Sequence, residues 1–211
     1  MADPAVDSVN IDDPTRDRRI LRRQARAARA ALSPAERDRA ARAISRHLIA
    51  LLRARGLLAP GRRIAVYRAV RGEIGVEAFM AHARRCQLFL PRVTAQRQGR
   101  MTFSPASSRL RRGAFGIPEP DSQVRCNAQW LHVVLLPLVG FDEAGNRLGS
   151  GAGFYDRALA FRSRRRRWRG PRLIGIAHSC QRLPRLPTLT TDVPLDAVVT
   201  ENGFFSLSGG L

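Results

Sequence analysis

The stretch LHVVLLPLVGFDEAGNRLGSGAGFYDRAL (131–159) decides the fold, because it runs from a buried apolar strand through a glycine-rich turn into a helix. Gly149, Gly151 and Gly153 stand at alternate positions just before the helix. Glycines spaced in this way let backbone N–H groups converge on an anion, and the helix dipole favours negative charge there. The turn lacks both the Gly-Lys-Ser/Thr of a Walker A loop and the dinucleotide fingerprint G-x-G-x-x-G. The spacing alone therefore fits a phosphate-binding turn and a structural loop equally well.

Two charged residues that flank the turn favour the phosphate-binding interpretation. Arg147 has a planar fork of donors that can clamp a phosphate. Asp156 stands in the first turn of the predicted helix, where its carboxylate can bind Mg²⁺ beside that phosphate. We therefore expect the segment RLGSGAGFYD (147–156) to bind phosphate in an ATP-using enzyme, with Arg147 and Asp156 as catalytic residues.

Short apolar runs, separated by polar or helical stretches, recur on both sides of this turn and predict buried strands. They are RIAVY (63–67), QLFLPRV (87–93), LHVVLLPLV (131–139), RLIGIAH (172–178) and LDAVVT (195–200). Helices are expected at 76–85 and 153–165, an edge strand at 100–104, and a loop at 109–120, where Gly and Pro recur. Strands that alternate with helices predict an α/β fold with a largely parallel sheet covered on both faces.

Two helices are expected before the first strand. Residues 16–32 combine strong helix formers with a regular apolar spacing and contain no breaker, which predicts a basic helix. Ser33, Pro34 and Glu36 then form a capping-box pattern that opens a second helix, which should end near Gly56.

Length and composition fit one soluble domain at 16–211, preceded by an acidic, Pro-containing and disordered tail at 1–15. That tail lacks the apolar region of a signal peptide, and the longest apolar run is too short to span a bilayer, so we expect a cytoplasmic protein. The three cysteines are widely spaced, and we expect them to be reduced and buried.

The formal net charge of +20 indicates an affinity for anions. All 37 basic residues are Arg and none is Lys, so part of the excess reflects a bias across the whole sequence. ATP or a polycarboxylate would still be attracted by this charge. Nucleic acid is not the expected partner, because the run at 162–169 reads best as a solvated helix end.

Six sequence elements, in the same order along the chain, resemble the 5-formyltetrahydrofolate cyclo-ligases, also called methenyltetrahydrofolate synthetases. They are RRILRRQARAARAALSPAER (18–37), RGEIG (71–75), LPR (90–92), GIPEP (116–120), PLVGFDEAGNRLGSGAGFYDRAL (137–159) and TDVPLDAVVTENG (191–203). The resemblance implies a three-layer α/β/α fold, of the kind shared with sugar-phosphate isomerases and CoA transferases. It also implies an ATP- and Mg²⁺-dependent conversion of 5-formyltetrahydrofolate to 5,10-methenyltetrahydrofolate, with release of ADP and phosphate.

The chemistry that the resemblance implies consists mostly of positioning two substrates and neutralising phosphate charge. It therefore needs no activated Ser, Cys or His nucleophile. The four histidines are scattered singly without partners at catalytic spacing, which agrees with that expectation.

The resemblance also assigns site residues by position. The residues assigned to ATP are Arg18, Arg22, Arg147, Leu148, Gly149, Ser150, Gly151, Ala152, Gly153, Phe154 and Tyr155. Those assigned to the folate are Arg68, Glu73, Ser150, Gly151, Ala152, Gly153 and Phe154, and those assigned to Mg²⁺ are Asp156 and Asp192. The family usually has Lys where Arg18 stands, and long side chains occur in some relatives at 150 and 152. Backbone contacts are therefore the safer expectation in the turn.

Several of these residues also have a purely structural interpretation. Arg18 and Arg22 could belong to a solvated basic helix face, Glu73 and Arg68 could be ordinary surface residues, and Asp192 could be a turn residue at a strand entry. Two other functions are also open: a binding module for RNA or another polyanion on the same fold, and an isomerase or transferase on the related fold. For the enzyme, we expect a monomer.

Overall fold

The computed structural model describes residues 14–93, 99–113, 116–164 and 170–206, and its centre is a seven-stranded sheet in the order β11-β10-β9-β6-β1-β2-β3. The strands are β1 (Arg63–Ala65), β2 (Gln87–Val93), β3 (Met101–Pro105), β6 (Val133–Pro137), β9 (Arg172–Ile176), β10 (Ala197–Thr200) and β11 (Gly203–Ser206). The five inner strands run parallel, and β3 and β11 pair antiparallel at the two edges. The five predicted inner strands and the predicted edge strand are thereby confirmed.

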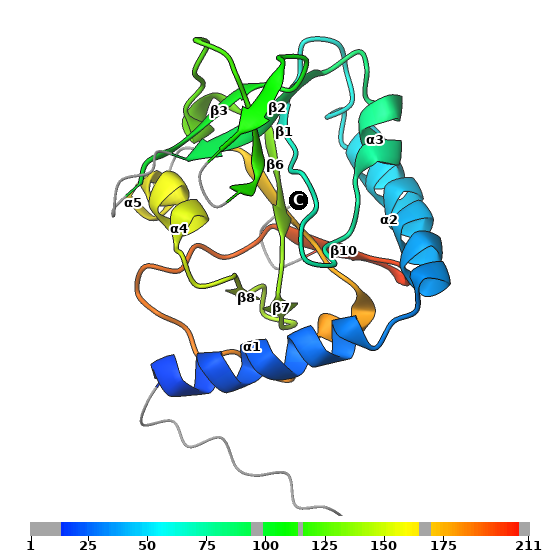
Figure 1. Cartoon of the computed structure of the whole chain (residues 1–211), viewed down its shortest axis with the longest axis vertical. Coiled ribbons are helices and arrows are strands. Elements are labelled where there is room, and N and C mark those ends of the chain that lie inside the picture. The colour runs from blue at the N-terminus through cyan, green and yellow to red at the C-terminus, as the bar shows by residue number, and fades with distance from the viewer. Residues whose placement is uncertain (1–13, 94–98, 114–115, 165–169, 207–211) are drawn as a thin grey trace, which may run out of the picture.

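Helices cover both faces of this sheet, as predicted (Figure 1). On one face, α2 (Pro34–Ala54) and α3 (Glu77–His82) pack through Leu48, Leu52 and Phe79 against buried strand residues. On the other face lie α4 (Phe154–Leu159), α5 (Phe161–Arg164) and the short 3₁₀ helix η2 (Ala128–Trp130), with Leu159 fully buried. The result is an α/β/α arrangement with an apolar core on each side of the sheet.

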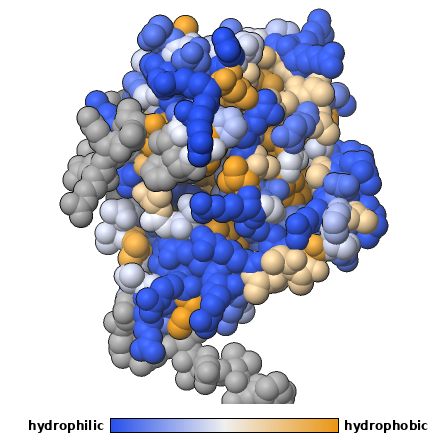
Figure 2. Space-filling model, in the orientation of Figure 1, coloured by the Kyte–Doolittle hydropathy of each residue, from blue (hydrophilic) through white to orange (hydrophobic). Residues whose placement is uncertain are grey.

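The first helix, α1 (Pro14–Ala30), lies across one end of the sheet instead of on a face (Figure 1). Its Leu21 packs against Leu148 and Leu186. Half of the exposed positions of this helix are arginines, and Figure 2 shows a largely hydrophilic surface over it, with apolar residues visible above it. Helix α1 therefore presents basic side chains to the region where strands β1, β2 and β6 end.

The second helix begins as the sequence predicts. The Ser33 hydroxyl accepts a hydrogen bond from the Glu36 amide at 3.3 Å, and the Glu36 carboxylate accepts one from the Ser33 amide at 2.7 Å. This reciprocal pair satisfies two amides that a helix start leaves without helical partners. The capping box is confirmed, and the C-terminus at Ala54 lies close to the predicted end.

Three expectations about the chain are corrected. The predicted loop at 109–120 contains a hairpin of β4 (Leu110–Arg112) and β5 (Pro118–Pro120), because Gly116, with φ of +73°, supplies its tight turn. The predicted helix at 153–165 is interrupted at Ala160 and forms α4 and α5. Among the cysteines, Cys86 and Cys126 are buried, but Cys180 is exposed.

The first helix also begins slightly before its predicted start. Helix α1 begins at Pro14, two residues before the predicted domain start at 16, and the rest of the predicted tail (1–13) lies outside the described residues. The arginine run at 165–169 lies outside them as well. Arg162, three residues before that run, forms a two-pronged ion pair with Asp196 at 2.9 and 3.0 Å. In the part of the chain that the structure describes, no helix has the length and apolar character needed to cross a bilayer.

Candidate active site

A cavity of about 1240 Å³ opens where the carboxyl ends of β1, β2 and β6 meet α1. This is the usual place for a ligand in an open α/β sheet. Its walls come from α1, from the segments that follow β1 and β6, from the glycine turn before α4, and from a loop at 189–192. The predicted site residues that line it are Arg18, Arg22, Arg68, Glu73, Arg147, Gly149, Ser150, Gly151, Ala152, Gly153, Phe154, Tyr155, Asp156 and Asp192.

The glycine turn is held between the small hairpin of β7 (Gly140–Phe141) and β8 (Arg147–Leu148) and the start of α4. Gly151 and Gly153 have φ of +111° and +66°, values that a side chain would strain, so glycine is required at both positions. Arg22 Nε donates to the Gly149 carbonyl at 2.9 Å and ties the turn to α1. The Leu148 side chain is fully buried outside the cavity, so any ATP contact at this position can use only its backbone.

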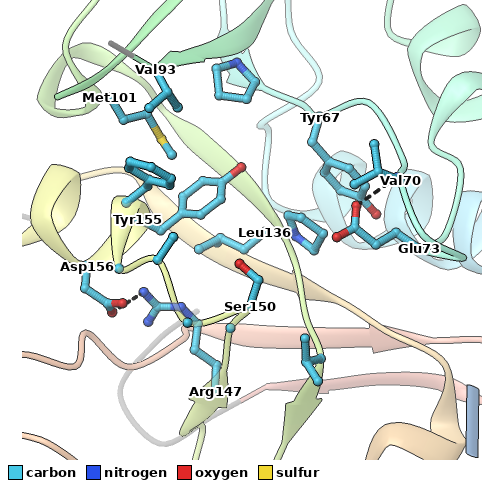
Figure 3. Close-up of a pocket in the computed structure, with 18 of the residues that line it drawn as sticks. Tyr67, Val70, Glu73, Val93, Met101, Leu136, Arg147, Ser150, Tyr155 and Asp156 are labelled. Atoms are coloured by element: carbon cyan, nitrogen blue, oxygen red, sulfur yellow. Dashed lines mark hydrogen bonds and ion pairs between the residues drawn. The ribbon is translucent and has the colours of Figure 1, made fainter. Parts of the chain in front are cut away.

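Two arginine–aspartate pairs stand on either side of this turn. Arg18 donates to both carboxylate oxygens of Asp192, at 2.5 and 3.3 Å, and to the Pro187 carbonyl at 2.9 Å. Arg147 donates to Asp156 Oδ1 (Figure 3). It also donates to the Val193 carbonyl. Each arginine is only 7% exposed, which makes these pairs stronger than surface ion pairs. Four residues that the sequence assigned to phosphate and Mg²⁺ are thus paired with one another.

Glu73 lies at the opposite end of the cavity. Its Oε2 accepts a hydrogen bond from the Val70 amide at 3.1 Å. Burial raises the pKa of the Glu73 carboxyl, and the Val70 hydrogen bond and the charges of Arg29 and Arg71 oppose that rise. Beside it, the Tyr67 hydroxyl donates to the Ile74 carbonyl at 2.8 Å.

Tyr155 lies between these two ends, with its hydroxyl directed into the cavity, and Leu136 and Met101 lie near its ring (Figure 3). Burial raises the pKa of the Tyr155 phenol, the Glu73 charge raises it further, and the Arg147 charge opposes both. The phenol therefore stays protonated at neutral pH and can donate a hydrogen bond to a ligand. Apolar and aromatic side chains with a few polar groups suit a flat heterocycle here.

Comparison with known proteins decides the family. A sequence model of the 5-formyltetrahydrofolate cyclo-ligase family matches residues 14–201. The chain belongs to this family. It is 31% identical over 189 residues to the 5-formyltetrahydrofolate cyclo-ligase of Haemophilus influenzae, which covers 86% of this chain and 96% of that protein. It is 34% identical over 145 residues to the enzyme of Escherichia coli K12, which covers 65% of this chain and 76% of that protein.

Solved structures of two methenyltetrahydrofolate synthetases share the fold. The Aquifex aeolicus protein superposes with a TM-score of 0.74 at 30% identity, covering 92% of this chain and 94% of that chain. The Mycoplasma pneumoniae protein superposes with a TM-score of 0.67 at 26% identity, covering 88% of this chain and 99% of that chain. The predicted fold class and family are thereby confirmed.

Several residues that line the cyclo-ligase cavity were not assigned from the sequence: Arg26, Arg29, Tyr67 and Glu119. Glu119 is 5% exposed and accepts a hydrogen bond from the Val93 amide at 3.1 Å. It falls within the GIPEP element and Tyr67 ends the RIAVY strand pattern, so both stood next to signals already recognised. Arg29 carried no such signal, because arginine recurs along the whole helix. Arg68 lies at the rim, where it contacts Glu77 at 3.7 Å.

Asp156 fits a magnesium ion better than Asp192 does. Asp192 directs both of its carboxylate oxygens to Arg18, and one of them also accepts from the Leu189 amide. Asp156 directs Oδ1 to Arg147, and the described part of the chain supplies no hydrogen bond to its Oδ2. No cluster of three or more metal-ligating side chains occurs among the described residues. A single carboxylate such as Asp156 is compatible with Mg²⁺, which takes one or two protein carboxylates and completes its shell with phosphates and water.

Proposed function

We propose that this chain catalyses the ATP-dependent cyclisation of 5-formyltetrahydrofolate to 5,10-methenyltetrahydrofolate, with release of ADP and phosphate. The observation that carries this proposal is one cavity with two chemically different ends. Three arginines and a glycine turn form the end suited to a triphosphate. A carboxylate, two tyrosines and apolar side chains form the end suited to a pterin.

The reaction needs both ends at once. The formyl oxygen of the folate attacks the γ-phosphorus, so a C–O–P linkage forms and the bond to ADP breaks. Folate N10 then bonds to the formyl carbon and loses its proton, and the C–O bond breaks with release of phosphate. An amide oxygen is a poor leaving group and a phosphate is a good one. Holding the formyl group beside the γ-phosphate is therefore the main task of the protein.

At the phosphate end, we assign charge neutralisation to Arg147, Arg18 and Arg22. Arg147 is buried and fixed by a carbonyl and a carboxylate, so its guanidinium is oriented before the substrate arrives. Burial lowers the pKa of Arg22, the charges of Arg18 and Arg26 lower it further, and the Asp192 charge opposes this fall. An anionic phosphate relieves the repulsion between these arginines.

Magnesium is assigned to Asp156, with the free Oδ2 as the ligand atom. When bound, Mg²⁺ would neutralise the charge of the nucleotide's terminal phosphates. We assign Asp192 chiefly to holding Arg18, since both of its oxygens already serve that arginine. A direct Mg²⁺ contact at Asp192 requires that this pair open.

At the folate end, Glu73 accepts hydrogen bonds from the amino and ring N–H donors of the pterin. One of its carboxylate oxygens bonds to Val70, which leaves the other for the substrate. Tyr155 stands between the two ends and donates from a protonated phenol. Arg68 at the rim and the backbone of 150–154 border the folate as it enters.

We place this reaction in the cytoplasm and in a monomer. Every side chain assigned above comes from one chain, so a second copy is not needed to complete the site. Elution of the purified protein from a sizing column at the mass of a dimer would contradict the monomer. A polyanion-binding role is disfavoured because a module that only binds polyanions does not need the glycine turn, Arg147 and Asp156 gathered in one cavity.

The test is turnover by purified protein supplied with MgATP and 5-formyltetrahydrofolate. We expect the absorbance of the methenyl product to rise, with one ADP released per product. Omission of ATP should stop the reaction. Well-folded protein that forms no product, and that binds RNA in a salt-sensitive manner without a thermal shift from MgATP, would refute the proposal in favour of the binding module.

A further inference from the structure

Arg29, near the end of α1, makes an unusual contact for an arginine in a basic helix. It is 7% exposed, and its Nη2 donates at 2.8 Å to the backbone carbonyl of Arg71. Its Nε lies 3.7 Å from the point where a side chain on Gly72 would begin. The guanidinium is therefore packed directly against the backbone of the segment that precedes Glu73.

One residue of that segment, Arg71, holds a backbone conformation that its side chain disfavours. Arg71 has φ of +52°, and it is the one non-glycine residue with positive φ in the described part of the chain. Left-handed backbone strains a residue that carries a Cβ, so surrounding contacts must hold it in place. Gly72 follows with φ of +79°, and the Glu73 amide donates to the Val70 carbonyl at 3.0 Å. The turn thus sets where the Glu73 side chain points.

The other end of the contact is firmly anchored. Arg37 of α2 donates to the carbonyls of Arg29 and Ala30, at 3.5 and 3.0 Å, and so fixes the C-terminus of α1. Burial lowers the pKa of Arg29, and the Glu73 charge acts against that effect. Arg29 and Glu73 therefore interact through space as well as through the turn.

We propose that Arg29 is a positioning residue for folate recognition: its guanidinium holds the strained Arg71–Gly72 turn and thereby orients the Glu73 carboxylate toward the substrate. Because Arg18 and Arg22 lie on the same helix, α1 contacts both ends of the cavity. Arg29 acts at the folate end through Glu73 and leaves nucleotide binding to the other arginines. This inference rests on the proposed function.

The experiment is a double-mutant cycle of Arg29→Gln and Glu73→Gln, read out as KM for 5-formyltetrahydrofolate, KM for ATP, and direct folate binding by fluorescence quenching. Arg29→Gln should raise the folate KM and Kd about tenfold, as expected for a lost charge-assisted hydrogen bond, with the ATP KM within about twofold. In the Glu73→Gln background the same change should cost less than about twofold, because the carboxylate it orients is gone. Arg23→Gln, an exposed arginine of α1 outside the cavity, is the matched control.

Two further arms separate positioning from other roles. If Arg29 contacted the folate glutamate directly, its effect would vanish with a formylated pteroate substrate that lacks the glutamate, and that result would overturn the proposal. Arg71→Gly should relieve the backbone strain, so adding it to Arg29→Gln should restore part of the folate affinity. This rescue also tests the proposal if Arg29→Gln alone folds poorly.

The outcomes of the cycle are distinct from failure of the function itself. Wild-type protein that neither binds the folate nor forms product would refute the proposed function. Wild-type activity with additive Arg29 and Glu73 effects, or with equal losses for ATP and folate, would overturn the positioning role alone.

Discussion

The charged side chains at the two ends of the cavity have different kinds of partner. At the phosphate end, Arg18 and Arg147 are already paired with Asp192 and Asp156. At the folate end, Glu73 has a backbone amide as its hydrogen-bond partner, and burial raises the pKa of its carboxyl. At one end the charged side chains form arginine–aspartate pairs, and at the other the Glu73 carboxylate has no ion-pair partner at contact distance among the described residues.

This difference predicts how each end meets its ligand. Under the proposed roles, a phosphate would take the place of the aspartate at an arginine, and Asp156 would then hold Mg²⁺ in place of the arginine. The pterin would instead bring N–H donors to the Glu73 carboxylate, which accepts a hydrogen bond from the Val70 amide on one of its two oxygens. Ligand binding at the phosphate end should therefore depend on electrostatics, and ligand binding at the folate end should depend on the conformation of the turn that precedes Glu73.

The largest effect is expected at Asp156. Asp156→Ala should abolish turnover, a loss of more than about 10³-fold in kcat, because the metal-linked charge neutralisation is lost. Asp156→Asn keeps the size of the side chain and should be almost as inactive, which separates lost charge from lost packing. Asp121→Ala, at an exposed carboxylate paired with Arg111, is the matched control and should stay active. Near-normal turnover of both Asp156 variants would show that the metal assignment is wrong.

A smaller but still severe loss is expected at Arg147. Arg147→Ala should reduce kcat on the order of 10²-fold, because a preoriented donor to the phosphate is removed. Arg147→Lys should recover only part of this, since a point charge cannot hold a phosphate and the Val193 carbonyl as a fork does. Steady-state kinetics at saturating substrate measure the effect. A kcat unchanged in Arg147→Ala would remove this arginine from the mechanism.

At the folate end, Glu73→Gln should weaken folate binding about tenfold or more and leave the ATP affinity nearly unchanged. The amide keeps the shape of the side chain but offers one acceptor where the carboxylate offers two. Titration of each substrate separately measures the difference. Equal losses for ATP and folate would break the division of the cavity into two ends.

The smallest effect concerns stability and has the opposite sign. Because the pKa of Glu73 is raised in the folded protein, the folded state binds this proton more tightly than the unfolded chain does. The carboxyl thus stabilises the fold most below the ordinary value of 4.5, and this contribution is lost as pH rises through the raised pKa. Glu73→Gln should therefore melt slightly higher than wild type at pH 7, and the difference should shrink in acid. Thermal melts of both proteins from pH 4 to 8 measure this difference. A Glu73→Gln variant that melts below wild type at pH 7 would contradict the prediction.

The sequence predicts the inner strands and the glycine turn well, because each depends on local pattern. Unbroken apolar runs indicate buried parallel strands, and glycine is required at 151 and 153 by backbone angles that other residues strain. The capping box at Ser33 is also local and is confirmed. The hairpin at 110–120 was missed because each of its strands has three residues and the second, Pro118–Pro120, contains two prolines and resembles a loop.

The sequence indicates which residues belong to the candidate site, but it does not indicate which of them contact one another. Arg147 and Asp156 were assigned separate roles, and nothing in their spacing shows that they pair. The Arg18–Asp192 pair joins the two ends of the described chain, a relation that only the tertiary fold creates. Arg29 is one arginine among many in its helix, and its role depends on the position of a turn 42 residues away.

The central claim is that the cavity holds the formyl oxygen of the folate against the terminal phosphate of ATP. The most direct test uses 5-formyltetrahydrofolate labelled with ¹⁸O in the formyl group, followed by mass analysis of the released phosphate. The account predicts one ¹⁸O atom transferred to phosphate for each methenyl product formed. Methenyl product accompanied by unlabelled phosphate, with the label released into water, would contradict it.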